Sequence, residues 1–149
     1  MENYKTFTTK NGEIILQYPS YWLDEMEGND TYLFYEEYLG SFRINLKRIS
    51  TKGFDLKAYL EKISKEKEDF GPEWKKFNDV EFLCYEDDWE DNNKVTHIHY
   101  FISGNKNLII TCSFAYDSAV IDDEVGMDEI GKELKGVEKL LSSIIFMEE

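Results

Sequence analysis

Apolar and polar side chains alternate along several short segments of this chain, a pattern typical of β-strands with one buried face. The clearest segment covers residues 41–49. Its alternating positions are Phe42, Arg43, Ile44, Asn45, Leu46 and Lys47. An aromatic-rich segment, residues 31–38, precedes it and is joined to it through Leu39-Gly40. The two segments therefore predict a β-hairpin.

A second predicted hairpin opens the chain. Residues 4–9 and 14–18 flank Asn11-Gly12, the kind of pair that a two-residue type I′ turn requires. Pro19 ends the second strand, because proline lacks a backbone donor and has a fixed φ. We expect the aromatic residues that follow, Tyr21 and Trp22, to pack onto the core before an acidic loop opens at Asp24.

Two segments have helical periodicity instead. The first is predicted to start after Asp55 as N-cap, with Phe54 packing on Tyr59, and to end before Gly71-Pro72. The apolar positions of the second helix are Met127, Ile130, Leu134, Val137 and Leu141. It leads through Ser142-Ser143 into a short apolar strand at residues 144–146.

Three further strands are predicted between the helices, over residues 80–85, 94–103 and 107–115, with turns at Asn92-Asn93 and Gly104-Asn105. Consecutive strands joined by short turns form an antiparallel meander. With the two helices, the pattern predicts an α+β fold: one antiparallel β-sheet flanked by helices, with residues 1–149 in a single domain.

Charge narrows the set of partners. Seventeen Lys and Arg residues against 31 Asp and Glu residues give a net charge of −14, which repels phosphate backbones and anionic membranes. We therefore expect no nucleic acid and no membrane as partner, but a basic protein. Cys84 and Cys112 lie in apolar strands, which favours reduced, buried thiols. These thiols and the lack of a signal-peptide pattern predict a cytoplasmic protein.

Three motifs occur in a recognisable order. They are Tyr18-Pro19-Ser20-Tyr21-Trp22 at a strand end, Gly40-Ser41-Phe42-Arg43 at a strand start, and Leu141-Ser142-Ser143-Ile144, where the last helix leads into a short apolar strand. In this order the chain resembles the PsbP-like superfamily, which includes the photosystem II extrinsic protein, the Ran-binding Mog proteins and many small bacterial domains of unknown function. The resemblance implies a PsbP-like α/β/α sandwich that binds other proteins. The superfamily has no common catalytic motif, so the resemblance assigns no role to any residue of this chain.

His97 and His99, the two histidines of the chain, are spaced i, i+2 and so share one face of a strand. A tight turn at Asn92-Asn93 sets Asp88 opposite His97 and Glu86 opposite His99. These four side chains are candidate ligands for zinc or another divalent metal. The alternative is cross-strand pairing of histidine with carboxylate and no metal.

The pairing of the next two predicted strands, residues 94–103 and 107–115, decides whether a cysteine can join the histidines as a ligand. Pairing Ile102 with Leu108 aligns Ile98 with Cys112 and gives one wholly apolar face. Cys112 would then point away from the histidines, which argues against a mixed cysteine and histidine site.

The densest acidic stretch predicts a partner-binding loop. Its residues are Glu86, Asp87, Asp88, Trp89, Glu90 and Asp91. An exposed tryptophan among carboxylates is suited to anchor a basic partner. The alternative is a solvated hairpin tip on which Trp89 packs against its own sheet.

No nucleophile elbow, P-loop, dinucleotide fingerprint, Cys-x-x-Cys pair or EF-hand loop occurs, so no catalytic residue and no cofactor are predicted. The leading hypothesis is a non-enzymatic cytosolic protein-binding module of bacterial type, such as an immunity protein, an effector chaperone or an adaptor. The alternative is a metal-binding protein or metal-dependent enzyme built on His97 and His99.

Overall fold

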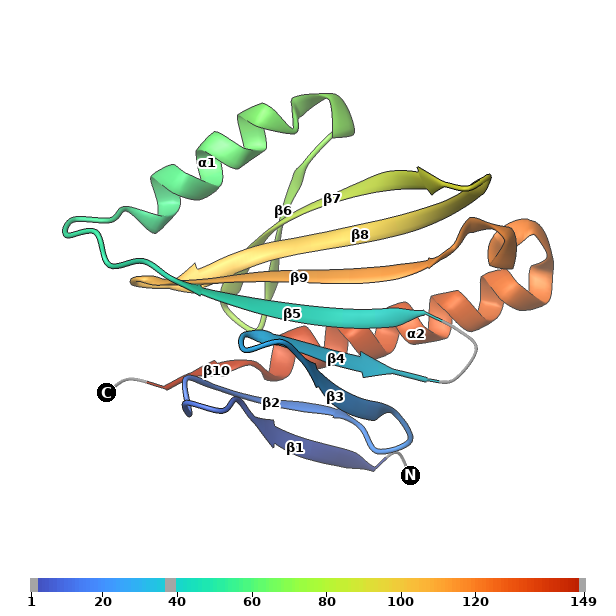
Figure 1. The fold of residues 1–149 in the computed structure, drawn as a ribbon, viewed down its shortest axis with the longest axis horizontal. Coiled ribbons are helices and arrows are strands. Elements are labelled where there is room, and N and C mark those ends of the chain that lie inside the picture. The colour runs from blue at the N-terminus through green and yellow to red at the C-terminus, as the bar shows by residue number, and fades with distance from the viewer. Residues whose placement is uncertain (1–2, 37–39, 148–149) are drawn as a thin grey trace.

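The computed structural model describes residues 3–36 and 40–147 of the chain. Within these residues the strands form a small and a large antiparallel sheet (Figure 1). The small sheet has the order β1-β2-β10, with β1 at Tyr4–Thr8, β2 at Ile14–Pro19 and β10 at Ile145–Phe146. The large sheet has the order β3-β4-β5-β9-β8-β7-β6. Its strands are β3 Leu23–Glu27, β4 Thr31–Tyr35, β5 Ser41–Arg48, β6 Glu73–Phe77, β7 Val80–Asp91, β8 Lys94–Asn105 and β9 Leu108–Asp117.

Two α-helices cover opposite faces of the large sheet. Helix α1, Leu56–Glu66, starts as predicted: Asp55 accepts a hydrogen bond from the amide of Ala58 at 3.1 Å. Helix α2, Glu124–Ser143, packs together with β2 against the other face. Short 3₁₀ helices follow α1 and precede α2, at Glu68–Phe70 and Ser118–Asp122. The predicted α+β sandwich is therefore confirmed. No helix among the described residues is long and apolar enough to cross a membrane.

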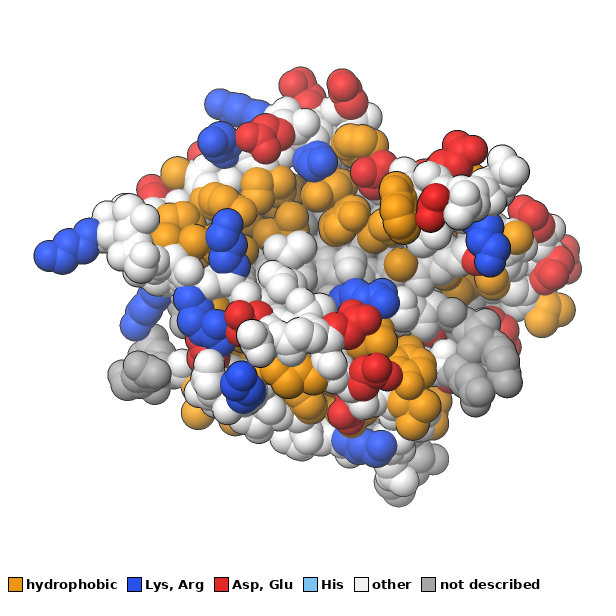
Figure 2. All heavy atoms as spheres, in the orientation of Figure 1, with side chains coloured by type: hydrophobic (Ala, Val, Ile, Leu, Met, Phe, Trp, Pro, Cys, Tyr) orange, Lys and Arg blue, Asp and Glu red, His pale blue; other side chains and the backbone are white. Residues whose placement is uncertain are grey.

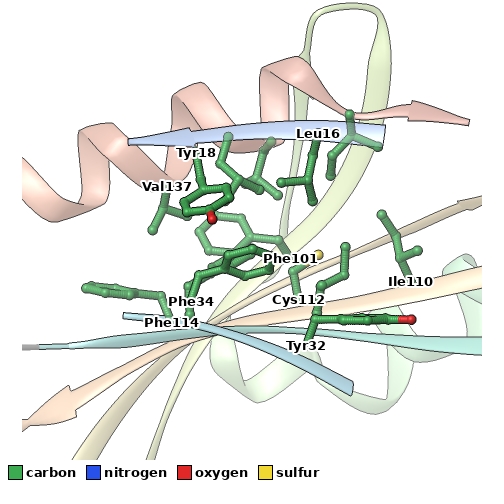
Figure 3. Close-up of a cluster of buried hydrophobic side chains, with 14 of the residues drawn as sticks. Leu16, Tyr18, Tyr32, Phe34, Phe101, Ile110, Cys112, Phe114 and Val137 are labelled. Carbon is green, nitrogen blue, oxygen red and sulfur yellow. The ribbon is translucent and has the colours of Figure 1, made fainter. Parts of the chain in front are cut away.

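The main core lies between the large sheet and the layer formed by α2 and the small sheet. Figure 3 shows part of it, with Leu16, Tyr18, Tyr32, Phe34, Phe101, Ile110, Cys112, Phe114 and Val137 labelled. A smaller cluster under α1 contains Leu60, Ile102 and Ile109. Adjacent residues of one strand thus serve different cores, because successive side chains point to opposite faces.

The first hairpin forms, but its predicted two-residue turn is wrong. The loop covers residues 9–13, and of the Asn11-Gly12 pair only Gly12 has a positive φ, 71°. The buried Thr9 is the physical reason. Its hydroxyl accepts hydrogen bonds from the amides of Glu13 and Ile14, both at 3.2 Å, and this closes a wider loop.

The segment after Pro19 was predicted in part. Trp22 is 1% exposed and belongs to the core as expected, but Tyr21 is 61% exposed because it points the other way from its neighbour. The acidic loop expected from Asp24 is instead strand β3, which pairs with β4. All five residues of β3 are exposed, so the strand has no apolar alternation to reveal it. Strand β6, with four exposed residues of five, was missed for the same reason.

The predicted pairing of β8 with β9 is wrong by three residues. Asn105 pairs with Leu108, and Phe101 pairs with Cys112. Both strands extend to a tight turn in which Lys106 has a φ of 55°. An odd shift exchanges the two faces, so Cys112 shares the face of His97 and His99.

In the hairpin predicted over residues 31–49, Tyr38 and Leu39 lie outside the described residues.

Candidate functional site

The long hairpin of β7 and β8 positions the candidate residues. Asn92 and Asn93 form its turn with φ values of 50° and 67°, as a type I′ turn requires. The predicted register is confirmed: Asp88 lies opposite His97, and Glu86 lies opposite His99. These four side chains share the face of the sheet that α2 covers further along the strands.

The side chains of Glu86, Asp88, His97, His99 and Tyr116 form what we call the histidine cluster. The His97 ring contacts one carboxylate on each side, with Nδ1 2.6 Å from an oxygen of Asp88 and Nε2 2.7 Å from Oε1 of Glu86. Nδ1 of His99 lies 3.5 Å from the same Glu86 oxygen. Its Nε2 lies 3.4 Å from the Tyr116 hydroxyl. Both histidines therefore converge on Glu86.

The two histidines of the cluster have pKa values shifted in opposite directions. Partial burial lowers the pKa of His97, but the hydrogen bonds to Glu86 and Asp88 outweigh it, so the pKa lies above its ordinary value. Burial lowers the pKa of His99, and the neighbouring His97 lowers it further. The hydrogen bond to His97 lowers the pKa of Glu86. One imidazole thus carries charge more readily than the other.

The cysteines lie near the cluster but take no part in it. Cys112 is fully buried, and this burial raises the pKa of its thiol far above the ordinary range. Burial also raises the pKa of Cys84 to about 11. Both residues are free thiols, as predicted. Although Cys112 shares the histidine face, its buried and protonated thiol is unsuited to bind a metal with the histidines.

A cavity of about 230 Å³ adjoins the cluster on the side of β6 and α2. Glu86 and His99 line it together with Lys75, Cys84, Leu134 and Glu138, among others. The cluster is consequently not sealed by the protein, and small ligands have room beside it.

The acidic run, predicted as a loop, is instead the outer half of strand β7. Its side chains therefore alternate between the two faces. Glu86, Asp88 and Glu90 share the cluster face, whereas Asp87, Trp89 and Asp91 point to the other face. Trp89 is 62% exposed and does not pack into the sheet. The six residues thus do not form one surface.

An apolar strip lies on this other face, and we call it the outer strip. It consists of Phe70, Tyr85, Trp89, Ile98 and Tyr100. Tyr85 and Tyr100 stack with their ring centroids 4.9 Å apart, and the ring of Phe70 lies 6.2 Å from Tyr85. Figure 2 shows hydrophobic side chains gathered between α1 and this hairpin, with acidic side chains beside them.

Sequence reasoning missed Tyr116 and Phe70. Tyr116 follows the predicted end of its strand, yet it continues the alternation of Cys112 and Phe114, which was a usable signal. The first helix was predicted to run up to Gly71, but Phe70 lies in a separate 3₁₀ helix and is exposed. Its contact with Tyr85 joins distant segments, and no local pattern indicates it.

Several solved structures share this fold. A crystal structure from Bacteroides thetaiotaomicron matches with a TM-score of 0.75 and 19% identity, covering 97% of this chain and 49% of that one. The present chain thus spans about half the length of that protein. LpqN, described as involved in cell envelope biogenesis of Mycobacterium tuberculosis, matches with a TM-score of 0.56 and 9% identity, covering 99% and 92%. At these identities the matches show the fold alone.

The large antiparallel sheet with helices on both faces agrees with the fold expected from the motif order. The cyanobacterial PsbP of Synechocystis sp. PCC 6803 is among the similar structures, at a TM-score of 0.49 and 9% identity over 99% of this chain and 94% of that one. No curated protein matches the sequence. A family model described as "Domain of unknown function (DUF3805)" matches residues 2–136, and the chain therefore belongs to this family.

Proposed function

We propose that this protein is a non-enzymatic binding module that holds a basic protein partner on the outer strip. The observation that carries the proposal is Trp89, a tryptophan with 62% of its surface exposed on a regular strand. Tryptophan is enriched among the residues that dominate binding energy at protein interfaces. A rigid strand presents such an anchor without an entropic cost of ordering a loop.

Other aromatic side chains extend the surface around this anchor. The stacked pair of Tyr85 and Tyr100 lies further along the same face of the hairpin, and Phe70 is 44% exposed beside it. Burial raises the pKa of Tyr85 to about 12, so its hydroxyl stays neutral at physiological pH. Rigid aromatic rings supply contact area at low cost in side-chain entropy. The strip therefore has the composition of an interface centre.

Charge selects the kind of partner. Asp87 and Asp91 flank Trp89 on the same face, and Asp117 lies opposite Thr96 on the neighbouring strand. Together with the net charge of −14, these carboxylates attract a basic surface and accelerate its association. Immunity proteins, effector chaperones and adaptors all need one specific protein contact of this kind, and the identity of the partner distinguishes them.

A capture experiment with paired variants tests the proposal. Immobilised wild-type protein should retain a basic partner at low salt and release part of it at high salt. Trp89→Ala should weaken this binding by about 30-fold or more, the loss typical of a dominant interface residue. Reversing Asp87 and Asp91 to lysine should weaken it as well, while leaving the partners of His97 in place.

Trp74→Ala is the matched control. Trp74 is also exposed, at 41%, and lies on the same face of the sheet, but it belongs to β6 and sits beside α1. This variant should bind as the wild type does. Retention of no specific protein would refute the proposal, and so would equal binding by the Trp89→Ala variant.

A further inference from the structure

The histidine cluster lies on the opposite face of the hairpin from the outer strip, so its chemistry is separate from partner binding there. We propose that Glu86, His97 and His99 bind one divalent transition-metal ion of the zinc type. Asp88 and Tyr116 hold the two imidazole rings in position for it. The ligand atoms of the first three residues already lie within 4.8 Å of one another.

The donor set defines the class of metal. Two imidazole nitrogens and one carboxylate oxygen suit zinc and neighbouring borderline ions. Calcium and magnesium select sites built from oxygen alone, and soft copper(I) selects thiolates. The thiols of Cys84 and Cys112 are buried and supply no ligand atom to this group. A borderline divalent ion is therefore the class that these residues fit.

The spacing of the ligand atoms fits such an ion. With bonds of about 2.1 Å and angles of 90–110°, neighbouring ligand atoms lie about 3.0–3.4 Å apart. Oε1 of Glu86 is 2.7 Å from Nε2 of His97 and 3.5 Å from Nδ1 of His99. These values bracket the required range. All three ligand atoms lie within 4.8 Å of one another, so the side chains have to rotate to close the remaining separation around an ion.

Each imidazole is also held through its other nitrogen. Nδ1 of His97 lies 2.6 Å from Asp88, and Nε2 of His99 lies 3.4 Å from the Tyr116 hydroxyl. Metal-binding histidines nearly always have such a partner, which fixes the ring orientation and the tautomer. Simple pairing of charges on a surface does not need this arrangement on both rings.

The position in the fold permits binding and exchange. The histidine side chains are 22% and 16% exposed, whereas Glu86 is 59% exposed and faces solvent. Lys75 is the nearby opposing charge, and its ammonium group is itself paired with Glu73 at 3.8 Å. Three protein ligands leave at least one coordination position for water. The adjoining cavity of about 230 Å³ gives that position room.

Zinc titration of the untagged, metal-free protein tests the site. Calorimetry should show one zinc ion per chain, and saturating zinc should raise the thermal midpoint. His97→Ala and His99→Ala should each reduce the zinc affinity by more than about 100-fold. Circular dichroism should show that both variants keep the wild-type fold, since neither histidine is fully buried.

A pair of neutralised aspartates provides the sharper comparison. Asp88→Asn removes the negative charge of the His97 partner and should reduce zinc affinity by about 10–100-fold. Asp87→Asn removes the same charge one residue away, on the other face of β7, and should leave the affinity unchanged. Absence of saturable zinc binding by the wild type would overturn the proposal. Equal losses in the two aspartate variants, or full binding by a double histidine variant, would overturn it too.

Discussion

The two halves of the β7–β8 hairpin differ in burial although one continuous ladder joins them. In the inner half, Phe82, Leu83, Phe101 and Ile102 are buried, because α1 and α2 cover the two faces. In the outer half, none of residues 86–99 is buried. The backbone is the same, so the covering layers decide which residues serve stability and which are open to ligands.

The largest expected loss of stability is at Phe82, an aromatic residue in the inner half of strand β7; exposed Trp89, in the outer half, is compared with it below. Phe82 is fully buried, and Phe82→Ala should lower the free energy of unfolding by about 3–5 kcal/mol through lost burial and the cavity left behind. Urea denaturation measures this loss. A loss below about 1 kcal/mol would show that the inner half is not the stabilising one.

A buried carboxylate in the core should make stability depend on pH. Burial raises the pKa of Glu133 to about 7, despite a hydrogen bond from the amide of Gly40. Its Oε1 has no hydrogen-bond partner among the described residues. The folded protein thus binds the extra proton between pH 4.5 and 7, and the free energy of unfolding falls as pH rises through that window, by about 3 kcal/mol at most.

Denaturation curves across this window provide the measurement. Glu133→Gln should flatten the dependence, because the amide never ionises. Glu138→Gln, on an exposed position of the same helix, should leave the slope as it is. An unchanged slope in the Glu133→Gln variant would assign the pH dependence to other groups.

A smaller effect is expected where β8 approaches β9 closely. A β-carbon on Gly104 would overlap the carbonyl oxygen of Leu108, a backbone atom held in the sheet. Gly104→Ala should therefore cost about 1–3 kcal/mol. Gly131→Ala in α2 is the control, since its β-carbon meets nothing within 4 Å and should add up to about 1 kcal/mol. Thermal midpoints of the two variants should shift in opposite directions.

The smallest effect is expected in the outer half. Trp89→Ala should change the free energy of unfolding by about 0.5 kcal/mol or less, because the side chain is mostly in water. Compared with Phe82→Ala by the same urea measurement, it should leave the midpoint nearly unchanged. A loss comparable to that of Phe82 would mean that Trp89 stabilises the fold, and the contrast between the halves would fail.

The parts of the fold that the sequence predicted are those with a strong local signal. The capping aspartate of α1 and the Asn92-Asn93 turn each act within a few residues, and the turn alone sets the register of the histidine cluster. Strands β3 and β6 lacked such a signal, because their side chains are mostly exposed and only pairing defines them.

The candidate site, like the fold, was predicted only where a local signal in the sequence defines it. Four members of the histidine cluster followed from the register of one hairpin, and the fifth, Tyr116, required the correct pairing of β8 with β9. That pairing was wrong because the apolar match between Ile102 and Leu108 was used to set the register, whereas the strands continue to a tight turn at Lys106. Once the acidic run is known to be part of a strand, the alternation of side chains is enough to divide its residues between the two faces.

The end of helix α2 belongs to the main core, although it lies beyond the matched family sequence. The family model ends at residue 136, but the main core also contains Val137, Leu140, Leu141 and Ile144. The hydroxyl of Ser143 further accepts a hydrogen bond from the amide of Gln17 at 2.8 Å, and β10 completes the small sheet beside β2. A chain shortened to residue 136 would lose these four core side chains and leave one edge of β2 unpaired. The packed core and its small sheet therefore extend at least through Phe146, ten residues past the matched sequence.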